Sequence, residues 1–265
     1  MLLMIAVIFL LVGALGGFLV GVTGFGSTLV VLPTSLILFS FLFPAAHVLK
    51  LAVGTTLACA FTAASISSTR HVKQGNVDWW IFRRIVPVYV IISTLGPALA
   101  HFMPVSLFHC IVGCFLFITS FLVLQKSEAP ESGDRLLSTS KLLIVASLAS
   151  LVTSMSGVAT GVTMVPFLSR YLPRLKAVGT SVCTAIVGCG VAVSTYIFTG
   201  YHVASLPPLA FGYVYLPAYV MLIIGVALFN RVGFQVAHRI SAVRFRLLLS
   251  LLLLVSGVYS IWLVF

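Results

Sequence analysis

Long apolar runs alternate with short polar stretches along the whole chain. The apolar runs are residues 2–20, 27–43, 45–68, 81–100, 105–124, 142–155, 162–172, 177–198, 209–229 and 245–264. A helix needs about 20 apolar residues to cross the hydrocarbon core of a bilayer, which is about 30 Å thick. When each interrupted run is counted as one crossing, the pattern predicts an all-α integral membrane protein with about eight transmembrane helices.

The two halves of the chain carry similar sequence elements in the same order. Gly24 and Gly157 are each followed nine residues later by a proline, Pro33 and Pro166 respectively. Further along, both halves contain an Ala-Val-Gly-Thr element, at residues 52–55 and 177–180. This order indicates an internal duplication.

The predicted organisation is a first membrane repeat at residues 1–125, a polar linker at 126–140 and a second membrane repeat at 141–265. Each repeat is expected to contain four helices, of which the first is broken by glycine. Four crossings in each half make the repeats parallel, whereas an odd number makes them inverted. The sequence leaves open whether the broken segments span the membrane or re-enter it.

A glycine-rich interruption divides the first long apolar segment of each half. Residues 2–43 as one straight helix would reach about 60 Å, twice the hydrocarbon thickness, so a break is expected near residues 21–28. Unwound backbone at membrane depth occurs only where it is buried in protein or faces a wet cavity. The helix after a break presents N–H groups whose partial positive charge favours an anion. Two matching breaks therefore predict a central substrate site, and close packing of small residues is the alternative.

The candidate substrate-binding residues lie at these breaks and early in the next helix of each half. At the breaks they are Gly24, Gly26, Ser27, Thr28, Gly157, Thr160, Gly161 and Thr163. In the next helices they are Lys50, Gly54, Thr55, Thr56, Lys176, Gly179, Thr180 and Ser181. The prolines Pro33 and Pro166 are interpreted as structural. The alternatives are hydroxyls bonded to their own helix and lysines that reach lipid headgroups.

Charged residues make up only 7% of the 265 residues, against about 25% in a soluble domain. The 15 basic and four acidic residues give a net charge of +11. In so apolar a chain the basic residues orient helices and contact the lipid bilayer, and no nucleic-acid partner is expected. With eight crossings they divide eight against seven between the two sides, which predicts no orientation.

None of the four acidic residues falls within a predicted span. Cation pumps and many proton-coupled carriers use intramembrane carboxylates, so the sequence favours an anionic or neutral solute. The histidines and cysteines show no metal or haem spacing, and there is no nucleotide-binding loop. No metal or other cofactor is expected, and a homo-oligomer is compatible with the sequence.

Two other classes of function compete with transport. Ser154-Met155-Ser156-Gly157 is superficially similar to the Gly-x-Ser-Gly nucleophile element of intramembrane serine hydrolases. The first glycine is missing and no histidine lies in a later span to act as a base, so an enzyme is not favoured. A structural or assembly subunit of a larger membrane complex stays open.

The element at Gly24–Pro33 and its partner at Gly157–Pro166 resemble the signature of the sulfite exporter TauE/SafE family. The Ala-Val-Gly-Thr elements, the basic loop before Gly75 and the duplication extend the resemblance over essentially the whole chain. It implies a multi-pass permease of the bacterial inner (plasma) membrane for sulfite, sulfoacetate or related sulfonates. The sequence departs from the family's consecutive glycines at Ser27, Thr28, Ala159 and Thr160.

Overall fold

A computed structural model describes residues 2–23, 26–124, 138–158, 160–236 and 242–263 of the chain. Within these ranges the chain forms ten α-helices and one short β-hairpin, so the all-α class is confirmed. The first five helices are α1 (Leu2–Thr23), α2 (Ser27–Leu42), α3 (Ala45–Lys73), α4 (Trp79–Phe102) and α5 (Val105–Leu124). The last five are α6 (Thr139–Ser156), α7 (Thr160–Leu168), α8 (Arg174–Gly200), α9 (Leu216–Val236) and α10 (Ala242–Trp262). Between α8 and α9, β1 (Ala210–Phe211) pairs antiparallel with β2 (Val214–Tyr215).

Among the described residues, six helices are long and apolar enough to cross a membrane: α1, α3, α4, α6, α8 and α9. The nine residues of α7 reach only about 14 Å at 1.5 Å per residue, less than half of the hydrocarbon core. The predicted number of about eight crossing helices is therefore not confirmed.

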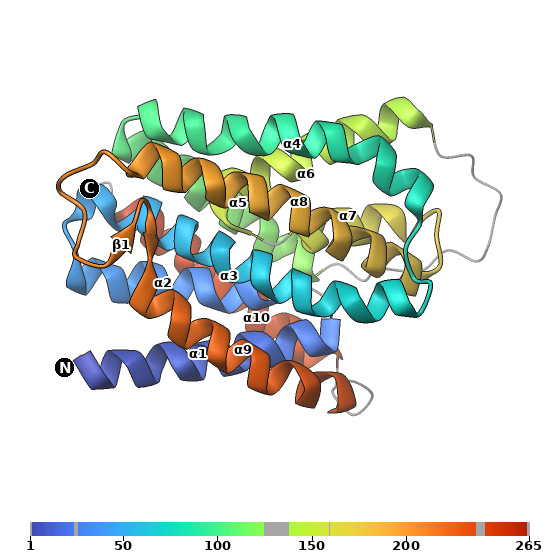
Figure 1. Cartoon of the computed structure of the whole chain (residues 1–265), viewed down its shortest axis with the longest axis horizontal. Helices are drawn as coiled ribbons and strands as arrows, with labels where there is room; N and C mark the ends of the chain where they lie inside the picture. The colour runs from blue at the N-terminus through green and yellow to red at the C-terminus, as the bar shows by residue number, and fades with distance from the viewer. Residues whose placement is uncertain (1, 24–25, 125–137, 159, 237–241, 264–265) are drawn as a thin grey trace.

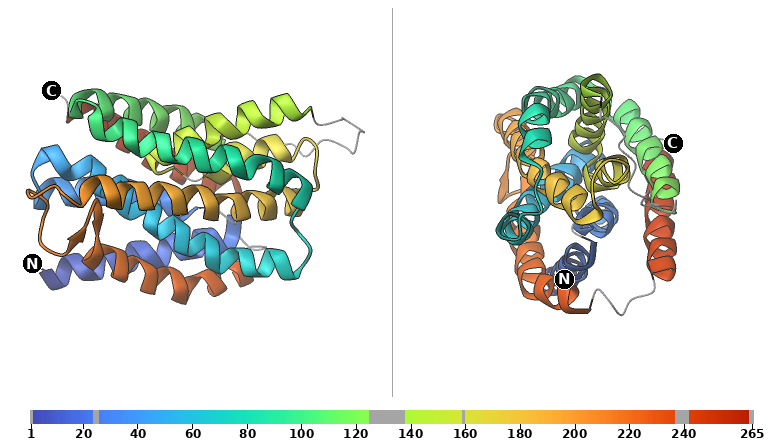
Figure 2. Two further views of the ribbon diagram at one scale, coloured as in Figure 1. Left: turned by 45° about the horizontal axis from the view of Figure 1, so that its top comes forward. Right: turned by 90° about the vertical axis from the view of Figure 1, so that its right-hand side faces the viewer.

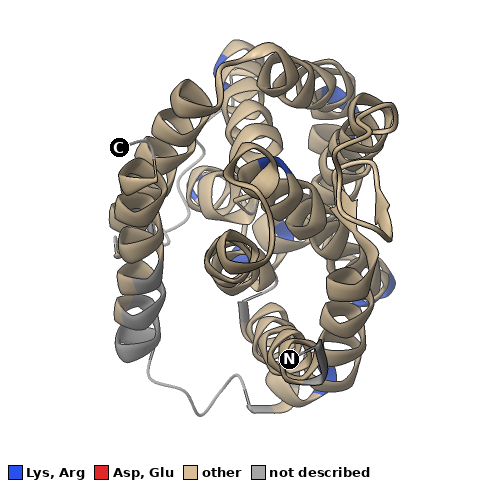
Figure 3. Ribbon diagram, turned by 90° about the vertical axis from the view of Figure 1, so that its left-hand side faces the viewer, with Lys and Arg blue, Asp and Glu red and all other residues tan. Residues whose placement is uncertain are grey.

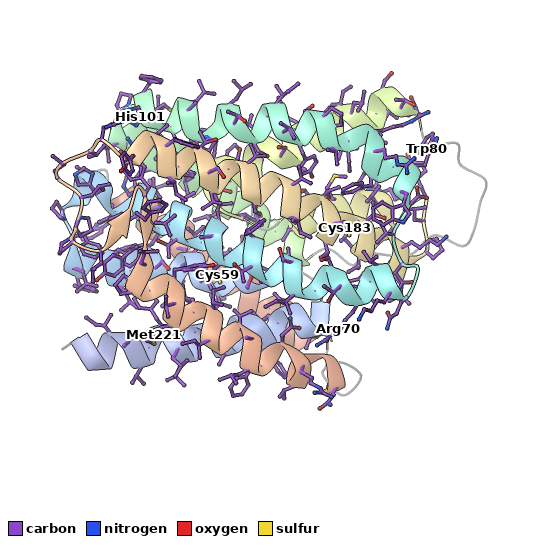
Figure 4. All side chains as sticks on the ribbon, viewed as in Figure 1. Cys59, Arg70, Trp80, His101, Cys183 and Met221 are labelled. Carbon is purple, nitrogen blue, oxygen red and sulfur yellow. The ribbon has the colours of Figure 1, made fainter. Side chains whose placement is uncertain are left out.

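The helices lie side by side in one elongated bundle (Figure 1). Seen end-on, α2 and α7 lie in the interior beside α3, and the outer helices surround them (Figure 2). Large apolar side chains project outward from the surrounding helices (Figure 4). Phe102 is 84% exposed and Phe198 is 77% exposed. In a membrane protein this outer apolar surface contacts lipid.

The two glycine-rich interruptions reverse the direction of the chain. The backbone of Gly16 in α1 lies against Ser27, and the rings of Phe9 in α1 and Phe39 late in α2 are 5.7 Å apart, so α2 runs back along α1. In the second half, Met164 and Leu168 of α7 pack in one buried cluster with Leu142 and Ala146 of α6, so α7 runs back along α6. Gly157 ends α6 with φ +70°, in the left-handed region where a side chain would be strained. Both interruptions therefore form helical hairpins.

The central helices α3 and α8 pack against each other and are antiparallel. Gly54, near the start of α3, packs against Tyr213 beyond the end of α8. Gly179, near the start of α8, packs against Asn76 beyond the end of α3. The two Ala-Val-Gly-Thr elements consequently lie at opposite ends of the bundle.

Candidate functional site

The two helix breaks border one pocket between α1, α2, α3, α7 and α8, which we call the central pocket. Its lining residues are Val20, Gly26, Ser27, Thr28, Ala60, Ala63, Ala64, Thr160, Gly161, Ser181, Val182, Ala185 and Cys189. The volume open to the centres of water-sized molecules is about 30 Å³. One water needs roughly 10–15 Å³ on this measure, so the pocket in this conformation has room for about two or three waters or a solute of that size.

The start of α2 supplies backbone and side-chain donors to the central pocket. Gly26 is the N-cap residue of α2 and makes no side-chain capping bond. The first N–H groups of a helix have no partner within that helix and carry its partial positive charge. Of the predicted site residues at this break, Gly26, Ser27 and Thr28 line the pocket, and Gly24 lies outside the described residues.

Two buried hydroxyls of the central pocket have no hydrogen-bond partner among the described residues. They belong to Thr28 at the start of α2 and to Ser181 in α8, and both side chains are almost fully buried. A buried hydroxyl without a hydrogen-bond partner lowers the stability of the folded protein by about 1–3 kcal/mol. A solute or water in the pocket would remove this cost.

The second break contributes Thr160 and Gly161 to the central pocket. The other two predicted residues of this break do not line it. The Thr163 hydroxyl donates to the Thr160 carbonyl at 3.0 Å. Gly157 lies against the side chains of Val53, Leu32 and Thr56. A Cβ at Gly157 would make only ordinary contacts with these side chains, so glycine is favoured there by its left-handed φ, and the Thr163 hydroxyl is bonded within its own helix.

The Gly-Thr pairs of α3 and α8 lie outside the central pocket and hold loops from the opposite half of the chain. Thr55 Oγ1 accepts a hydrogen bond from the Tyr215 N–H at 3.0 Å. Thr180 Oγ1 accepts one from the Asp78 N–H at 2.9 Å. A Cβ atom on Gly54 or Gly179 would collide with the backbone carbonyl of the loop packed there. We refer to the two contacts as the Thr55 and Thr180 clasps.

Three further predicted residues also lie outside the central pocket. Thr56 is fully buried, and its hydroxyl has no partner among the described residues. Lys50 is 8% exposed, and its Nζ donates to the His101 carbonyl at 3.2 Å. The same Nζ lies 5.6 Å from the centroid of the Tyr213 ring, whose phenol has its pKa raised by burial. Lys176 is exposed at the start of α8. The two lysines thus occupy unlike environments.

The family model "Sulfite exporter TauE/SafE" matches residues 9–260. The chain belongs to the sulfite exporter TauE/SafE family. A probable membrane transporter protein of Haemophilus influenzae is 31% identical over 216 residues, covering 79% of this chain and 80% of the relative. A second, from Methanocaldococcus jannaschii, is 24% identical over 259 residues, covering 95% and 94%. No solved structure matches the chain.

This TauE/SafE protein is accordingly a multi-pass membrane transporter of the cell membrane, with lipid around its apolar outer surface. Among the described residues there is no group of three or more His, Cys, Asp or Glu side chains that would hold a metal ion. Pro33 lies inside α2 and Pro166 inside α7, each seven positions into its helix. Neither proline lines the central pocket.

Sequence reasoning missed the apolar part of the pocket wall in this TauE/SafE protein. Ala60, Ala63 and Ala64 of α3 line the pocket, with Cys189 of α8 across from them. The three alanines are spaced i, i+3 and i+4, so they share one helix face. Small residues at this spacing leave room beside a helix, and that spacing was the signal available in the sequence.

Proposed function

We propose that this protein is a secondary transporter that moves small anions, sulfur oxyanions or organosulfonates, across the plasma membrane and binds them in the central pocket. The observation that supports this is the meeting of the α2 and α7 N-termini at one pocket with the unpartnered Thr28 and Ser181 hydroxyls. Helix N-termini attract anions, and hydroxyls donate to oxyanions. None of the described lining residues is charged, so the wall holds no carboxylate to repel an anion.

We further propose that residues 1–125 and 141–265 are inverted repeats joined by the segment 126–140. The sequence match pairs α1–α5 with α6–α10. Several packing pairs agree with it, since α1 packs on α9 as α6 packs on α4, and α2 packs on α3 as α7 packs on α8. Each half has five helical elements that alternate in direction, rather than the four expected, so α6 starts at the end of the bundle opposite to the start of α1 and the second repeat runs inverted. Inverted repeats around a central site favour alternating access.

An intramembrane hydrolase receives no support from the environment of Ser156. Its Oγ donates to the Val152 carbonyl at 2.6 Å and accepts from the Val158 N–H at 3.2 Å. A nucleophilic serine instead bonds a general base. A structural or assembly subunit is the remaining alternative, and transport by the purified protein alone would rule against it.

The test is uptake by proteoliposomes that contain only this protein. Labelled sulfite, sulfoacetate, other sulfonates, carboxylates and amino acids are offered in parallel, with protein-free liposomes as the control. We expect sulfite or a sulfonate to accumulate. Uptake of amino acids alone, or of none of these solutes, would contradict the proposal.

Variants of the pocket hydroxyls test whether the central pocket binds the solute. Thr28→Val and Ser181→Ala each remove one donor, and a hydrogen bond to a charged group contributes about 1.5–3 kcal/mol. We expect each to raise the half-saturating solute concentration about 10- to 150-fold. The matched control is Thr34→Val on the same helix, whose hydroxyl donates to the Val30 carbonyl of that helix. Equal affinity in all three variants would place binding elsewhere.

A further inference from the structure

The basic side chains gather at one end of the bundle. We call this end the basic end; it holds the end of α3 and the starts of α4, α6 and α8 (Figure 1). The opposite end, with β1 and β2, is called the hairpin end. Nine of the ten described Lys and Arg side chains lie toward the basic end: Arg70, Lys73, Arg83, Arg84, Lys141, Arg170, Arg174, Lys176 and Arg231. The end-on view shows them spread around the bundle (Figure 3).

Hydrogen bonds between distant segments fix which termini share an end. Arg84 Nη1 donates to Thr139 Oγ1 at 2.7 Å, which joins the starts of α4 and α6. The Thr180 clasp joins the starts of α8 and α4. At the hairpin end, the bond from Lys50 to the His101 carbonyl joins the start of α3 to the end of α4.

The hairpin end has a different polar composition. Its one described Lys or Arg is Lys50, which is buried. Its other titratable bases are histidines, among them His47, whose Nε2 lies 2.9 Å from Ser205 Oγ. The two ends therefore differ strongly in exposed positive charge.

Both ends also carry the aromatic side chains typical of membrane interfaces. Trp79 and Trp80 are exposed at the basic end, where the Arg84 guanidinium lies 3.6 Å from the centroid of the Trp80 ring. Tyr201 and Trp262 are exposed at the hairpin end. Trp and Tyr concentrate at headgroup level on both sides of a bilayer. The two ends of the bundle are thus the two ends of its passage through the membrane.

We propose that the basic end is the cytoplasmic end of the protein, where its exposed Lys and Arg side chains bind anionic lipid headgroups. The β-hairpin, the start of α1 and the end of α10 then lie on the opposite side. Cytoplasmic loops carry an excess of Lys and Arg, and the cytoplasmic leaflet is anionic. Most of this charge lies on helix ends that flank short loops, as the rule requires: five residues separate α3 from α4 and α7 from α8.

The even division of charge predicted from eight crossings is wrong for the described residues, because the chain turns back at each break. When α6 and α7 count as one crossing, Arg174 and Arg231 fall on the side opposite to Arg70 and Lys73. Because α7 returns to the end where α6 starts, all four lie toward the same end.

The orientation also brings the central pocket closer to the cytoplasm than to the outside. Ala60 and Ala64 of the pocket lie about 14–20 Å along α3 from Lys73, and about 22–28 Å from Ala45 at the hairpin end. The orientation itself rests on the charge distribution and on no property of the solute. A failed transport assay would leave it unaffected.

The test uses single cysteines in a background without the five native ones. Ser140→Cys places an exposed thiol at the basic end, and Ala204→Cys places one at the hairpin end. Bacterial spheroplasts are treated with a membrane-impermeant thiol reagent, before and after permeabilisation. We expect Cys at 204 to react in intact spheroplasts and Cys at 140 to react only after permeabilisation.

The reverse pattern would overturn the proposal and would favour a basic end that collects anions from outside. Reaction of both cysteines in intact spheroplasts would overturn it as well, since it would indicate mixed orientation. A reporter fused after Phe265 in the unmodified chain gives an independent result. Alkaline phosphatase should be active there and green fluorescent protein should be dark, and the opposite pair of results would refute the orientation.

Discussion

The Thr180 clasp connects the start of α8 to the loop that precedes α4, and Thr180→Val breaks it without changing the shape of the side chain. Thr180 is fully buried, and its Oγ1 accepts from the Asp78 N–H at 2.9 Å. Valine leaves this N–H without its acceptor, which costs about 1–3 kcal/mol. The equilibrium between docked and undocked loop should therefore shift about 5- to 150-fold.

This shift should be measurable as a loss of thermal stability and a changed transport rate. One kcal/mol corresponds to about 2–4 °C in Tm for chains of 150–250 residues, so we expect Tm to fall by roughly 2–12 °C. Because Thr180 does not line the central pocket, the half-saturating solute concentration should stay the same. The assays are the thermal unfolding of purified protein and concentration-dependent uptake by proteoliposomes.

The matched control is Thr184→Val, one turn further along α8. Thr184 is equally buried, but its Oγ1 donates to the Ser181 carbonyl of its own helix at 2.9 Å. Losing such a local bond costs little stability, so the Tm of this variant should stay close to that of the unmodified protein. If Thr180→Val kept its stability and weakened solute binding tenfold, Thr180 would contact the solute and the clasp assignment would be refuted.

Two further predictions rest on other contacts outside the central pocket. Gly54→Ala should destabilise the protein far more than Gly190→Ala. The new Cβ at position 54 would meet the Tyr213 backbone, which cannot move aside easily, whereas the Cβ at position 190 would meet the side chain of Phe61. The yield and Tm of the purified variants measure the difference. Lys50→Met and Lys176→Gln should each leave the half-saturating solute concentration in proteoliposome uptake unchanged, because neither lysine lines the pocket. A tenfold increase for Lys50→Met alone would contradict this and would show that the Lys50 ammonium binds the solute as the solute passes through the protein.

Much of the architecture was predictable because the lipid bilayer sets the length and the apolar character of the helices that cross it. Apolar runs of about 20 residues require lipid, and Leu2–Phe43 was too long for one crossing, so the break before Ser27 followed from length alone. What the sequence left open was the direction of the chain after each break. Length and composition do not distinguish a kinked crossing from a hairpin, and that choice decided the helix count and the side on which each basic residue lies.

Whether a site residue could be predicted depended on how far away in the sequence its contacts lie. Thr28 was predictable as a pocket residue because its position, the second residue of a helix after a break, is a local feature. Thr55 and Thr180 were predicted as solute contacts because their hydroxyls come early in the helix that follows each break and could line the same cavity. Their partners are backbone groups at Tyr215 and Asp78, more than 100 residues away in sequence. No local pattern identifies such contacts.

The need to release the solute gives a physical reason why none of the described residues that line the proposed site is charged. A transporter must release what it binds, and an ammonium beside the solute would hold an anion tightly in a medium of low dielectric constant. The N-termini of α2 and α7 supply only partial positive charge, and the Thr28 and Ser181 hydroxyls supply donors that water can also satisfy. If the pocket binds an anion as proposed, these groups would favour negative charge and still permit release. We therefore expect Thr28→Lys to bind the anion more tightly and to transport it more slowly, and faster transport by this variant would contradict the reasoning.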